Sequence, residues 1–311
     1  MLDTNGSALG SAVGEPRGPA LRACSSPRPA FFVIGPPRTG TSWLHEILKE
    51  RTLLPSPTKE TRFFDTHFDR GIRWYLSHYR PKQAMLMGEI APTYFASATA
   101  CERIARVLPG AKIVCTFRNP VERVISLYRL KRAYGMSPWE IEEAISRDPE
   151  LIESSRYATY LRLWQCAFGA KQVLATVYED LQNDAQAYVD ALADFIGLAR
   201  FPLAPSIVRD LNTSRVLTHP RSYYRTRTAT ALADHLKARR LDFIVTGVRR
   251  SPLMKLFLGG GPAFAQLSLE FLHKLYDLFR PEVEELENML NRDLSAWKSN
   301  QPALKPVQTA T

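Results

Sequence analysis

Short apolar runs alternate with helical patterns through the first two thirds of the chain. The runs are strand-like in length, and the segments between them repeat apolar residues at the helical period. This alternation is typical of a parallel sheet, because each connection between parallel strands has to cross a face of the sheet. The strands are expected at 30–34, 85–90, 112–117 and 172–178, and the helices at 41–51, 96–107, 121–132 and 182–196. The sequence therefore predicts an α/β fold with a mainly parallel sheet flanked by helices on both faces. A last segment, 267–294, predicts one or two docking helices split near Pro281.

Length and composition fit a folded, globular chain. Of the 311 residues, 45% are hydrophobic and 23% are charged, which excludes a disordered, collagen-like or coiled-coil protein. We expect one domain over residues 30–298, after a disordered lead-in (1–29) without an apolar secretory signal and before a flexible tail (299–311). No run approaches the roughly 18 apolar residues of a membrane-spanning helix. The four cysteines form no C-x-x-C pair, so we expect no disulfide framework, no zinc site and a reducing, cytoplasmic location.

The chain carries an excess of positive charge. It has 41 Lys and Arg against 31 Asp and Glu, so the protein should attract anions. Between residues 215 and 255 stand ten basic residues and two aspartates. This basic segment is either a solvated helix with loops or a gate over an acceptor. A further hypothesis is that Arg249, Arg250 and Lys255, which flank apolar side chains, contact an anionic membrane surface peripherally.

The loop after the first strand has the composition of a phosphate-binding loop. Gly35-Pro36-Pro37-Arg38-Thr39-Gly40-Thr41-Ser42 leads into a helix that we expect Thr41 or Ser42 to cap. Backbone N–H groups converge at such a helix start, and the helix dipole adds positive potential. The nucleotide-triphosphatase pattern G-x-x-x-x-G-K-[ST] needs a lysine where this chain has Thr41, and the cation comes earlier, as Arg38. We therefore predict an anion site without a metal, formed by Arg38 and the amides of Thr39, Gly40, Thr41 and Ser42.

A second candidate phosphate site follows another strand. Arg118-Asn119-Pro120 comes directly after the run 112–117, and the next helix carries Ser126. The guanidinium group and the hydroxyl group can face an anion at the carboxyl end of this strand. Two anion sites at neighbouring strand ends predict a nucleotide with two separate phosphate groups.

Several more blocks follow these loops in a fixed order. They are Lys59-Glu60-Thr61-Arg62-Phe63-Phe64-Asp65, Gly71-Ile72-Arg73-Trp74-Tyr75, Gly88-Glu89-Ile90-Ala91-Pro92-Thr93-Tyr94, the stretch 118–128, the stretch 157–164, Tyr178-Glu179-Asp180-Leu181 and the ending 279–297. Together the blocks make the chain resemble the sulfotransferases that use 3′-phosphoadenosine-5′-phosphosulfate (PAPS), especially the heparan-sulfate-type and bacterial members. The resemblance covers roughly residues 30–297, which is more specific than any one motif.

The resemblance implies a P-loop-like domain that transfers a sulfuryl group to a hydroxyl or amine group without a metal. Arg38 and the loop amides would hold the 5′-phosphosulfate, and Arg118 with Ser126 would hold the 3′-phosphate. Glu60 would be the general base, with Glu89 as the second candidate. The direction of Lys59 stays open. We expect PAPS as co-substrate, its product 3′-phosphoadenosine-5′-phosphate (PAP), and a carbohydrate, glycolipid or other hydroxyl acceptor.

The chain departs from the heparan-type pattern on the acceptor side. Arg62 stands where those enzymes have a histidine after the catalytic glutamate, Ile90 stands where they have a lysine, and Arg38 replaces the lysine of their first loop. The later glycine-rich basic loop has its nearest counterpart at 212–227, with Arg215 and Arg221 as candidate contacts. Two alternatives remain at this point. A P-loop kinase would need a lysine at position 41 and Mg²⁺, and a basic nucleic-acid-binding protein rests on net charge alone.

Overall fold

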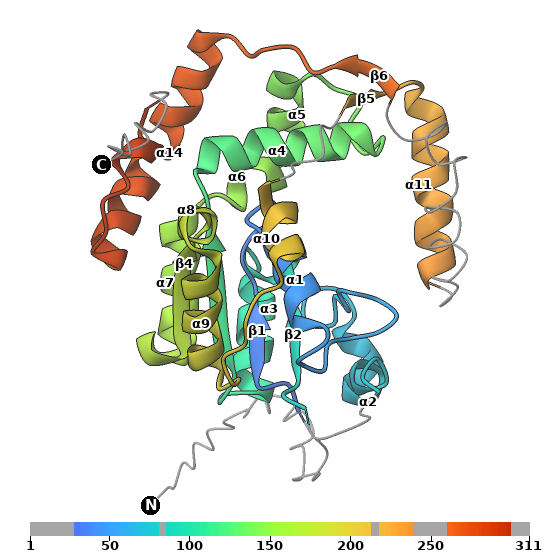
Figure 1. The fold of residues 1–311 in the computed structure, drawn as a ribbon. Coiled ribbons are helices and arrows are strands. Elements are labelled where there is room, and N and C mark those ends of the chain that lie inside the picture. Colours follow the sequence, from blue (N-terminus) through green and yellow to red (C-terminus); the bar gives the residue numbers. More distant parts are fainter. Residues whose placement is uncertain (1–27, 81–84, 213–217, 239–259, 300–311) are drawn as a thin grey trace, which may run out of the picture.

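A four-stranded parallel sheet forms the centre of the protein (Figure 1). The computed structural model describes residues 28–80, 85–212, 218–238 and 260–299. In the sheet, the strand order is β2 (Gly88–Ile90), β1 (Phe31–Val33), β3 (Lys112–Phe117) and β4 (Val173–Val177). All three pairings are parallel, with Phe31 opposite both Gly88 and Lys112. The predicted α/β class and parallel sheet are confirmed.

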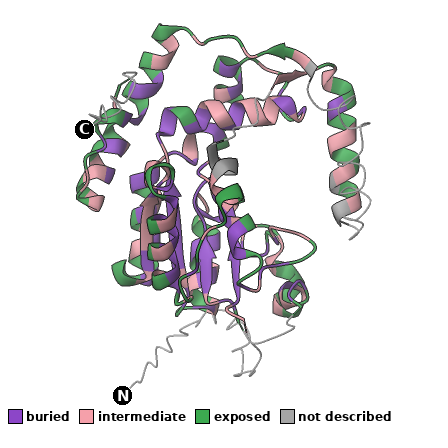
Figure 2. Ribbon diagram, in the orientation of Figure 1, coloured by how far each residue is buried: buried purple, intermediate pink, exposed green. Residues whose placement is uncertain are grey.

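The strands β1 and β2 and nearly all of β3 are buried because both faces of the sheet are covered, whereas the edge strand β4 is buried only at its two ends (Figure 2). Along β1 the side chains alternate between two cores: Phe31 and Val33 join one, and Phe32 joins the other. The core with Phe31 is covered by α1 (Thr41–Leu48), α8 (Tyr178–Asn183) and α9 (Ala185–Ile196). The core with Phe32 is covered chiefly by α3 (Ala98–Val107), α4 (Pro120–Ala133), α7 (Tyr157–Phe168) and α14 (Leu269–Leu290).

Two predicted helices differ from those observed. The segment 182–196 is part of two helices, since the chain leaves the helical conformation at Asp184, whose side chain caps α9 by accepting from the Ala187 amide at 2.9 Å. The expected split near Pro281 is absent: α14 continues through this proline. Buried side chains on both sides of it, Phe279 and Val283, pack into the same core and hold the helix together.

Several observed elements were not among those predicted. They are α2 (Gly71–Leu76), α5 (Ile141–Arg147), α6 (Glu150–Glu153), α10 (Pro205–Asn212), α11 (Tyr223–Ala238), a two-stranded antiparallel sheet of β5 (Thr218–Pro220) and β6 (Gly260–Ala263), and 3-10 turns at Phe68–Arg70, Pro92–Tyr94, Ala170–Gln172 and Ser295–Trp297. In Figure 1, α11 stands apart from the central sheet. It meets the C-terminal end of α4, where the Thr230 hydroxyl donates to the Tyr134 carbonyl at 2.9 Å.

Some predictions fall on residues outside the described part of the chain. These include nearly all of the lead-in and the tail, as well as Arg215, Arg249, Arg250 and Lys255 of the basic segment. Among the described residues, no helix is both long and apolar enough to cross a bilayer.

Candidate active site

The loop between β1 and α1, residues 35–42, is called the phosphate loop below. It lies directly against β3. A Cβ atom on Gly35 would stand 1.8 Å from the Thr116 hydroxyl oxygen and 2.6 Å from the Thr116 nitrogen, so only glycine fits here. The Thr39 hydroxyl donates to the Pro36 carbonyl at 2.8 Å and lies 2.6 Å from the Thr116 hydroxyl. Thr39 is buried, so its side chain holds the loop in shape and only its backbone remains for a ligand.

Gly40, rather than Thr41 or Ser42, precedes the first turn of α1. It has φ 94°, in the left-handed region that glycine adopts without strain, and the ring of Tyr178 closes on the space where a Cβ would stand. The expectation of a Thr41 or Ser42 cap was therefore wrong: no side chain caps the helix, and both residues lie inside it. Because no side chain caps this helix, the first backbone amides of α1 are left to bind a ligand, and the positive end of the helix dipole lies at the same place.

Arg38 joins the two predicted phosphate sites. Its backbone has φ 79°, and its Nε donates to the Ser126 hydroxyl of α4 at 2.9 Å. Burial, and second the nearby charge of Arg118, lower the pKa of the Arg38 guanidinium. Two cations facing the same space repel each other until an anion lies between them.

Arg118 follows β3 as predicted and points across the start of α4. It forms an ion pair with Glu122, with Nη2 and Oε2 2.6 Å apart, and its guanidinium lies 5.1 Å from the centre of the Tyr178 ring. Glu122 and Ser126 are four residues apart on α4 and so share one face of that helix. The ends of β1 and β3 thus bring Arg38, Arg118 and Ser126 to one place, as the sequence predicted.

The segment 59–65, called the carboxylate loop below, carries Glu60 and Lys59. The two side chains are 30% and 31% exposed, so both are open to a ligand. The Lys59 Nζ lies 3.3 Å from the Ser42 hydroxyl and 3.9 Å from Glu60 Oε1. Burial raises the pKa of Glu60, and the charge of Lys59 opposes that rise. Glu60, the predicted base, therefore lies near the phosphate loop, with Lys59 between the two. The direction of the Lys59 side chain, which the sequence left open, is toward Ser42.

Glu89, the second candidate for the base, is fully buried beneath the carboxylate loop. Its Oε1 accepts from the Thr61 amide and hydroxyl, each at 2.7 Å, and its Oε2 accepts from the Tyr75 hydroxyl at 3.0 Å. Burial raises the pKa of Glu89 to about 7. A buried carboxylate enclosed by these donors is not open to an acceptor. Its contacts favour a structural role, in which Glu89 holds Thr61, the residue after Glu60.

Other elements fix the far side of the carboxylate loop. The Arg103 guanidinium of α3 donates to the Phe64 carbonyl at 2.8 Å, and the Phe64 amide donates to the Tyr94 hydroxyl at 3.3 Å. Arg62, which replaces the histidine of the heparan-type pattern, has φ 52° and pairs with Asp65 at 3.4 Å. Ile90, which replaces a lysine, is fully buried in the core and cannot contact an acceptor.

Tyr178 is a site residue that reasoning from single motifs did not single out. It comes directly after β4, so a third strand end contributes to the site, and its ring contacts both the phosphate loop and Arg118. The next two residues, Glu179 and Asp180, contact the C-terminal segment. Trp297 Nε1 donates to Glu179 Oε1 at 2.9 Å, and Arg292 pairs with Asp180 through both carboxylate oxygens.

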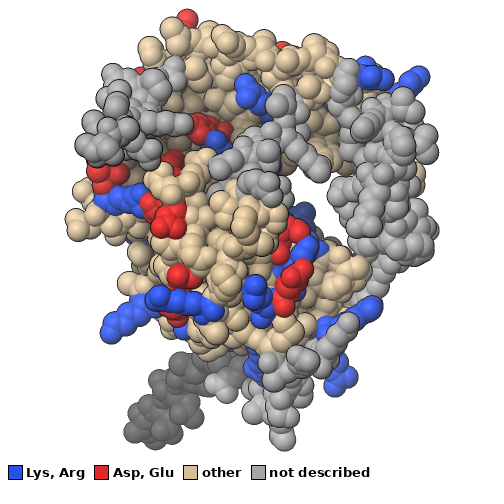
Figure 3. Space-filling model, in the orientation of Figure 1, with Lys and Arg blue, Asp and Glu red and all other residues tan. Residues whose placement is uncertain are grey.

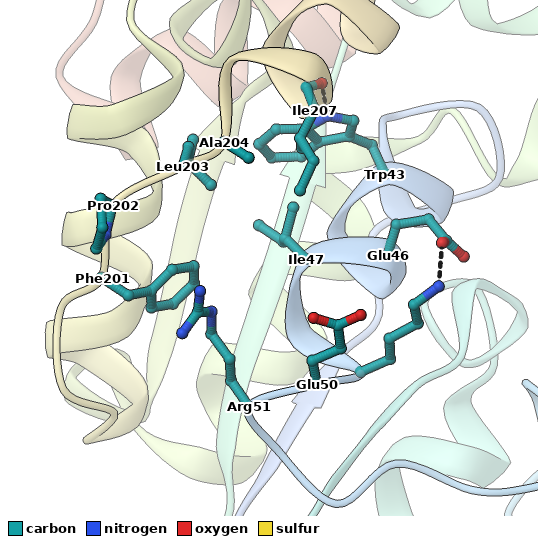
Figure 4. A pocket seen from close by; sticks show the side chains of 11 residues that line it. Trp43, Glu46, Ile47, Glu50, Arg51, Phe201, Pro202, Leu203, Ala204 and Ile207 are labelled. Atoms are coloured by element: carbon teal, nitrogen blue, oxygen red, sulfur yellow. Dashed lines mark hydrogen bonds and ion pairs between the residues drawn. The ribbon is translucent and has the colours of Figure 1, made fainter.

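A separate hollow of about 360 Å³ lies on the outer side of α1 (Figure 4). Trp43 and Ile47 of α1 face Phe201 and Ile207 across it, and the Trp43 Nε1 donates to the Ile207 carbonyl at 3.0 Å. None of the predicted site residues lines this hollow. On the face in Figure 3, charges of both signs are interspersed over the described surface, without one large basic patch. The described residues hold no group of three or more His, Cys, Asp or Glu that could bind a metal.

Comparison with known proteins identifies the family. The sulfotransferase domain family matches residues 28–239. The chain belongs to the sulfotransferase family. This confirms the family and the enzyme class that the ordered motifs predicted.

Curated relatives of this sulfotransferase share part of its length. The human bifunctional heparan sulfate N-deacetylase/N-sulfotransferase 2 is 28% identical over 197 residues, which are 56% of this chain and 22% of that protein. Human heparan sulfate glucosamine 3-O-sulfotransferase 6 is 29% identical over 209 residues, 61% of this chain and 59% of that protein. The chain thus spans about a fifth of the first relative and less than two thirds of the second.

A solved structure shares the fold of this sulfotransferase. The sulfotransferase from Alicyclobacillus acidocaldarius matches with a TM-score of 0.61 at 20% identity, over 88% of this chain and all of that one. The likeness supports the sulfotransferase fold.

Proposed function

We propose that this sulfotransferase moves a sulfuryl group from PAPS to a hydroxyl or amine group of a carbohydrate or glycoconjugate. One observation carries the proposal: the Lys59 Nζ lies 3.3 Å from the Ser42 hydroxyl, at the uncapped start of α1, and 3.9 Å from the partly buried carboxylate of Glu60. An anion site and a base thereby lie side by side. The heparan-sulfate names of the curated relatives support the acceptor class.

The site residues fit a nucleotide with separate 5′ and 3′ groups. The amides at the start of α1 and Arg38 would bind the 5′-phosphosulfate. Arg118 would leave Glu122 to bind the 3′-phosphate, and this exchange costs little because an exposed ion pair contributes only about 0.2–1 kcal/mol. Ser126, which accepts a hydrogen bond from Arg38, would help Arg118 to hold the 3′-phosphate.

The chemistry follows from this arrangement. The oxygen or nitrogen of the acceptor group forms a bond to sulfur, and Glu60 accepts the proton that this atom loses. The bond between sulfur and the bridging oxygen breaks, and that oxygen keeps the electron pair on the 5′-phosphate of PAP. Arg38 and the α1 amides stabilise the charge that develops there, which is the largest contribution in many enzymes. Burial of Glu60 raises its pKa and makes it a stronger base than an exposed carboxylate.

Thermal unfolding with nucleotides tests the co-substrate. PAP should raise the midpoint more than AMP, ADP or Mg-ATP, because a ligand at 100 times its dissociation constant adds about 2.7 kcal/mol to the free energy of unfolding. A rise with Mg-ATP alone would instead support the kinase alternative. Transfer of labelled sulfate from PAPS to a panel of sugars and amino sugars then tests the acceptor, with a lipid-linked sugar included.

A further inference from the structure

The Lys59 side chain lies over the first turn of α1, in a place that disfavours a cation. Its Nζ is 3.3 Å from the Ser42 hydroxyl, and the helix dipole gives this end of α1 a positive potential. Burial lowers the pKa of Lys59, while the charges of Glu60 and Glu46 act against that shift. Burial and the helix dipole together oppose a charged ammonium group here unless a further anion joins it.

Glu60 alone does not satisfy this ammonium group. The Lys59 Nζ and Glu60 Oε1 are 3.9 Å apart, at the outer limit of an ion pair. By contrast, the Nζ of Lys131, a half-buried lysine on α4, lies 2.5 Å from carboxylate oxygens of both Asp148 and Glu150. Lys59 therefore keeps donors for a third group, which would lie between the Ser42 hydroxyl and the Glu60 carboxylate.

We propose that Lys59 is a further catalytic residue, whose ammonium group contacts the sulfuryl group between the phosphate loop and the Glu60 carboxylate. This rests on the proposed function. As the acceptor forms its bond to sulfur, the bond from sulfur to the bridging oxygen breaks. Lys59 stays protonated and stabilises the negative charge on the oxygens of the transferred sulfuryl group. The proton of the acceptor goes to Glu60, and the electron pair of the broken bond goes to PAP.

A second consequence concerns the base. The charged groups that influence Glu60 are Lys59 and Arg62, which favour its ionised form, and Asp65 and Glu150, which oppose it. Glu89, buried beneath the same loop, also interacts with it. Removing Lys59 takes away the cation with the largest effect, so the pKa of Glu60 should rise. The fall of kcat/KM on the acid side should then move to higher pH.

The test compares Lys59→Met and Lys59→Arg with Lys49→Met. Lys49 is a matched control: it directly follows α1, is exposed and pairs with Glu46. We expect Lys59→Met to lower kcat by about 10²–10³-fold, the range for loss of one transition-state donor, and to shift the acid limb to higher pH. Lys59→Arg should restore the acid limb, and Lys49→Met should change neither quantity. PAP binding, measured by calorimetry, should survive in all three variants.

The outcomes separate this inference from the proposed function. Wild-type kcat and an unchanged acid limb in Lys59→Met, in an enzyme that transfers sulfate, would overturn the role of Lys59 and leave the proposed function intact. Loss of PAP binding together with unfolding in Lys59→Met, unrelieved by Lys59→Arg, would show a structural role and overturn the inference as well. A wild-type protein that neither binds PAP nor transfers sulfate would overturn the proposed function itself.

Discussion

The phosphate loop and the carboxylate loop meet at Ser42 and Lys59, yet they are held in different ways. The phosphate loop is fixed by its own neighbours in sequence and by the next strand, through Gly35, Thr39 and Thr116. The Thr39 side chain turns inward, while the backbone amides at the start of α1 and the Arg38 guanidinium are left for the proposed ligand. The carboxylate loop is fixed from beneath by distant side chains, Glu89 and Arg103 among them, and presents its own side chains to the ligand.

Substitutions in the two loops should therefore have different effects. A backbone site is damaged only by changes that move the backbone, whereas a side-chain site is damaged by loss of one functional group. Changes beneath the carboxylate loop should therefore affect the base indirectly, and changes beneath the phosphate loop should affect the whole sheet.

The largest effect should come from Glu60→Gln. The amide keeps the shape of the side chain but accepts no proton, so turnover should fall by about 10²–10⁴-fold, the range for general-base catalysis. PAP binding should remain, because the phosphate loop is intact. Glu50→Gln, an exposed change just after α1, is the control for turnover. Turnover within a few-fold of wild type in Glu60→Gln would assign the base to another group.

Glu89→Gln should change the pH dependence of stability. Because the folded-state pKa is raised to about 7 from an ordinary 4.5, the folded protein holds a proton that the unfolded chain has lost. The contribution of Glu89 to the free energy of unfolding thus falls as pH rises from about 4.5 to about 7, by about 3 kcal/mol in total. Gln removes this fall. Urea unfolding at several pH values measures it, and parallel curves for the two proteins would contradict the prediction.

Gly35→Ala should loosen the contact between the phosphate loop and β3. The added methyl group overlaps both the side chain and the backbone of Thr116, and such overpacking costs about 1–3 kcal/mol. Gly110→Ala is the matched control, since a Cβ there meets nothing within 4 Å. Denaturant unfolding should separate the two variants. Equal stability would mean that the loop can move away from β3 at no cost.

The smallest effect should come from Arg118→Ala. It should weaken PAP binding by roughly tenfold and leave AMP binding unchanged, because AMP has no 3′-phosphate and a charge-assisted hydrogen bond contributes about 1.5–3 kcal/mol, less the cost of leaving Glu122. Glu122→Gln should act in the opposite direction, since it frees Arg118 beforehand. Calorimetric titration with both nucleotides measures the difference. Equal losses for PAP and AMP would refute a separate 3′-phosphate site.

The same contrast explains how far the sequence could predict the site. Arg38, Arg118 and Ser126 could be placed because parallel strands bring their carboxyl ends to one edge, a rule that needs only the order of strands. The direction of Lys59 and the buried contacts of Glu89 could not be predicted, because they depend on tertiary packing between segments far apart in the chain. Likewise α11 and the β5–β6 pair lack a marked period, and α14 continues through Pro281 with buried residues of one core on both sides of it.

The link from Arg292 to Asp180 spans 112 residues, and that from Trp297 to Glu179 spans 118. Both reach the helix that Tyr178 begins, beside the phosphate loop. During synthesis the earlier parts of a chain emerge and begin to fold first. The strands and the phosphate loop can therefore form on the ribosome. The contacts that hold the helix beginning at Tyr178 form only after α14 and the turn that follows it have been synthesised. A nascent chain halted before residue 292 would hold the phosphate loop without these two contacts, so the nucleotide binding that we propose should develop only as translation of this segment ends.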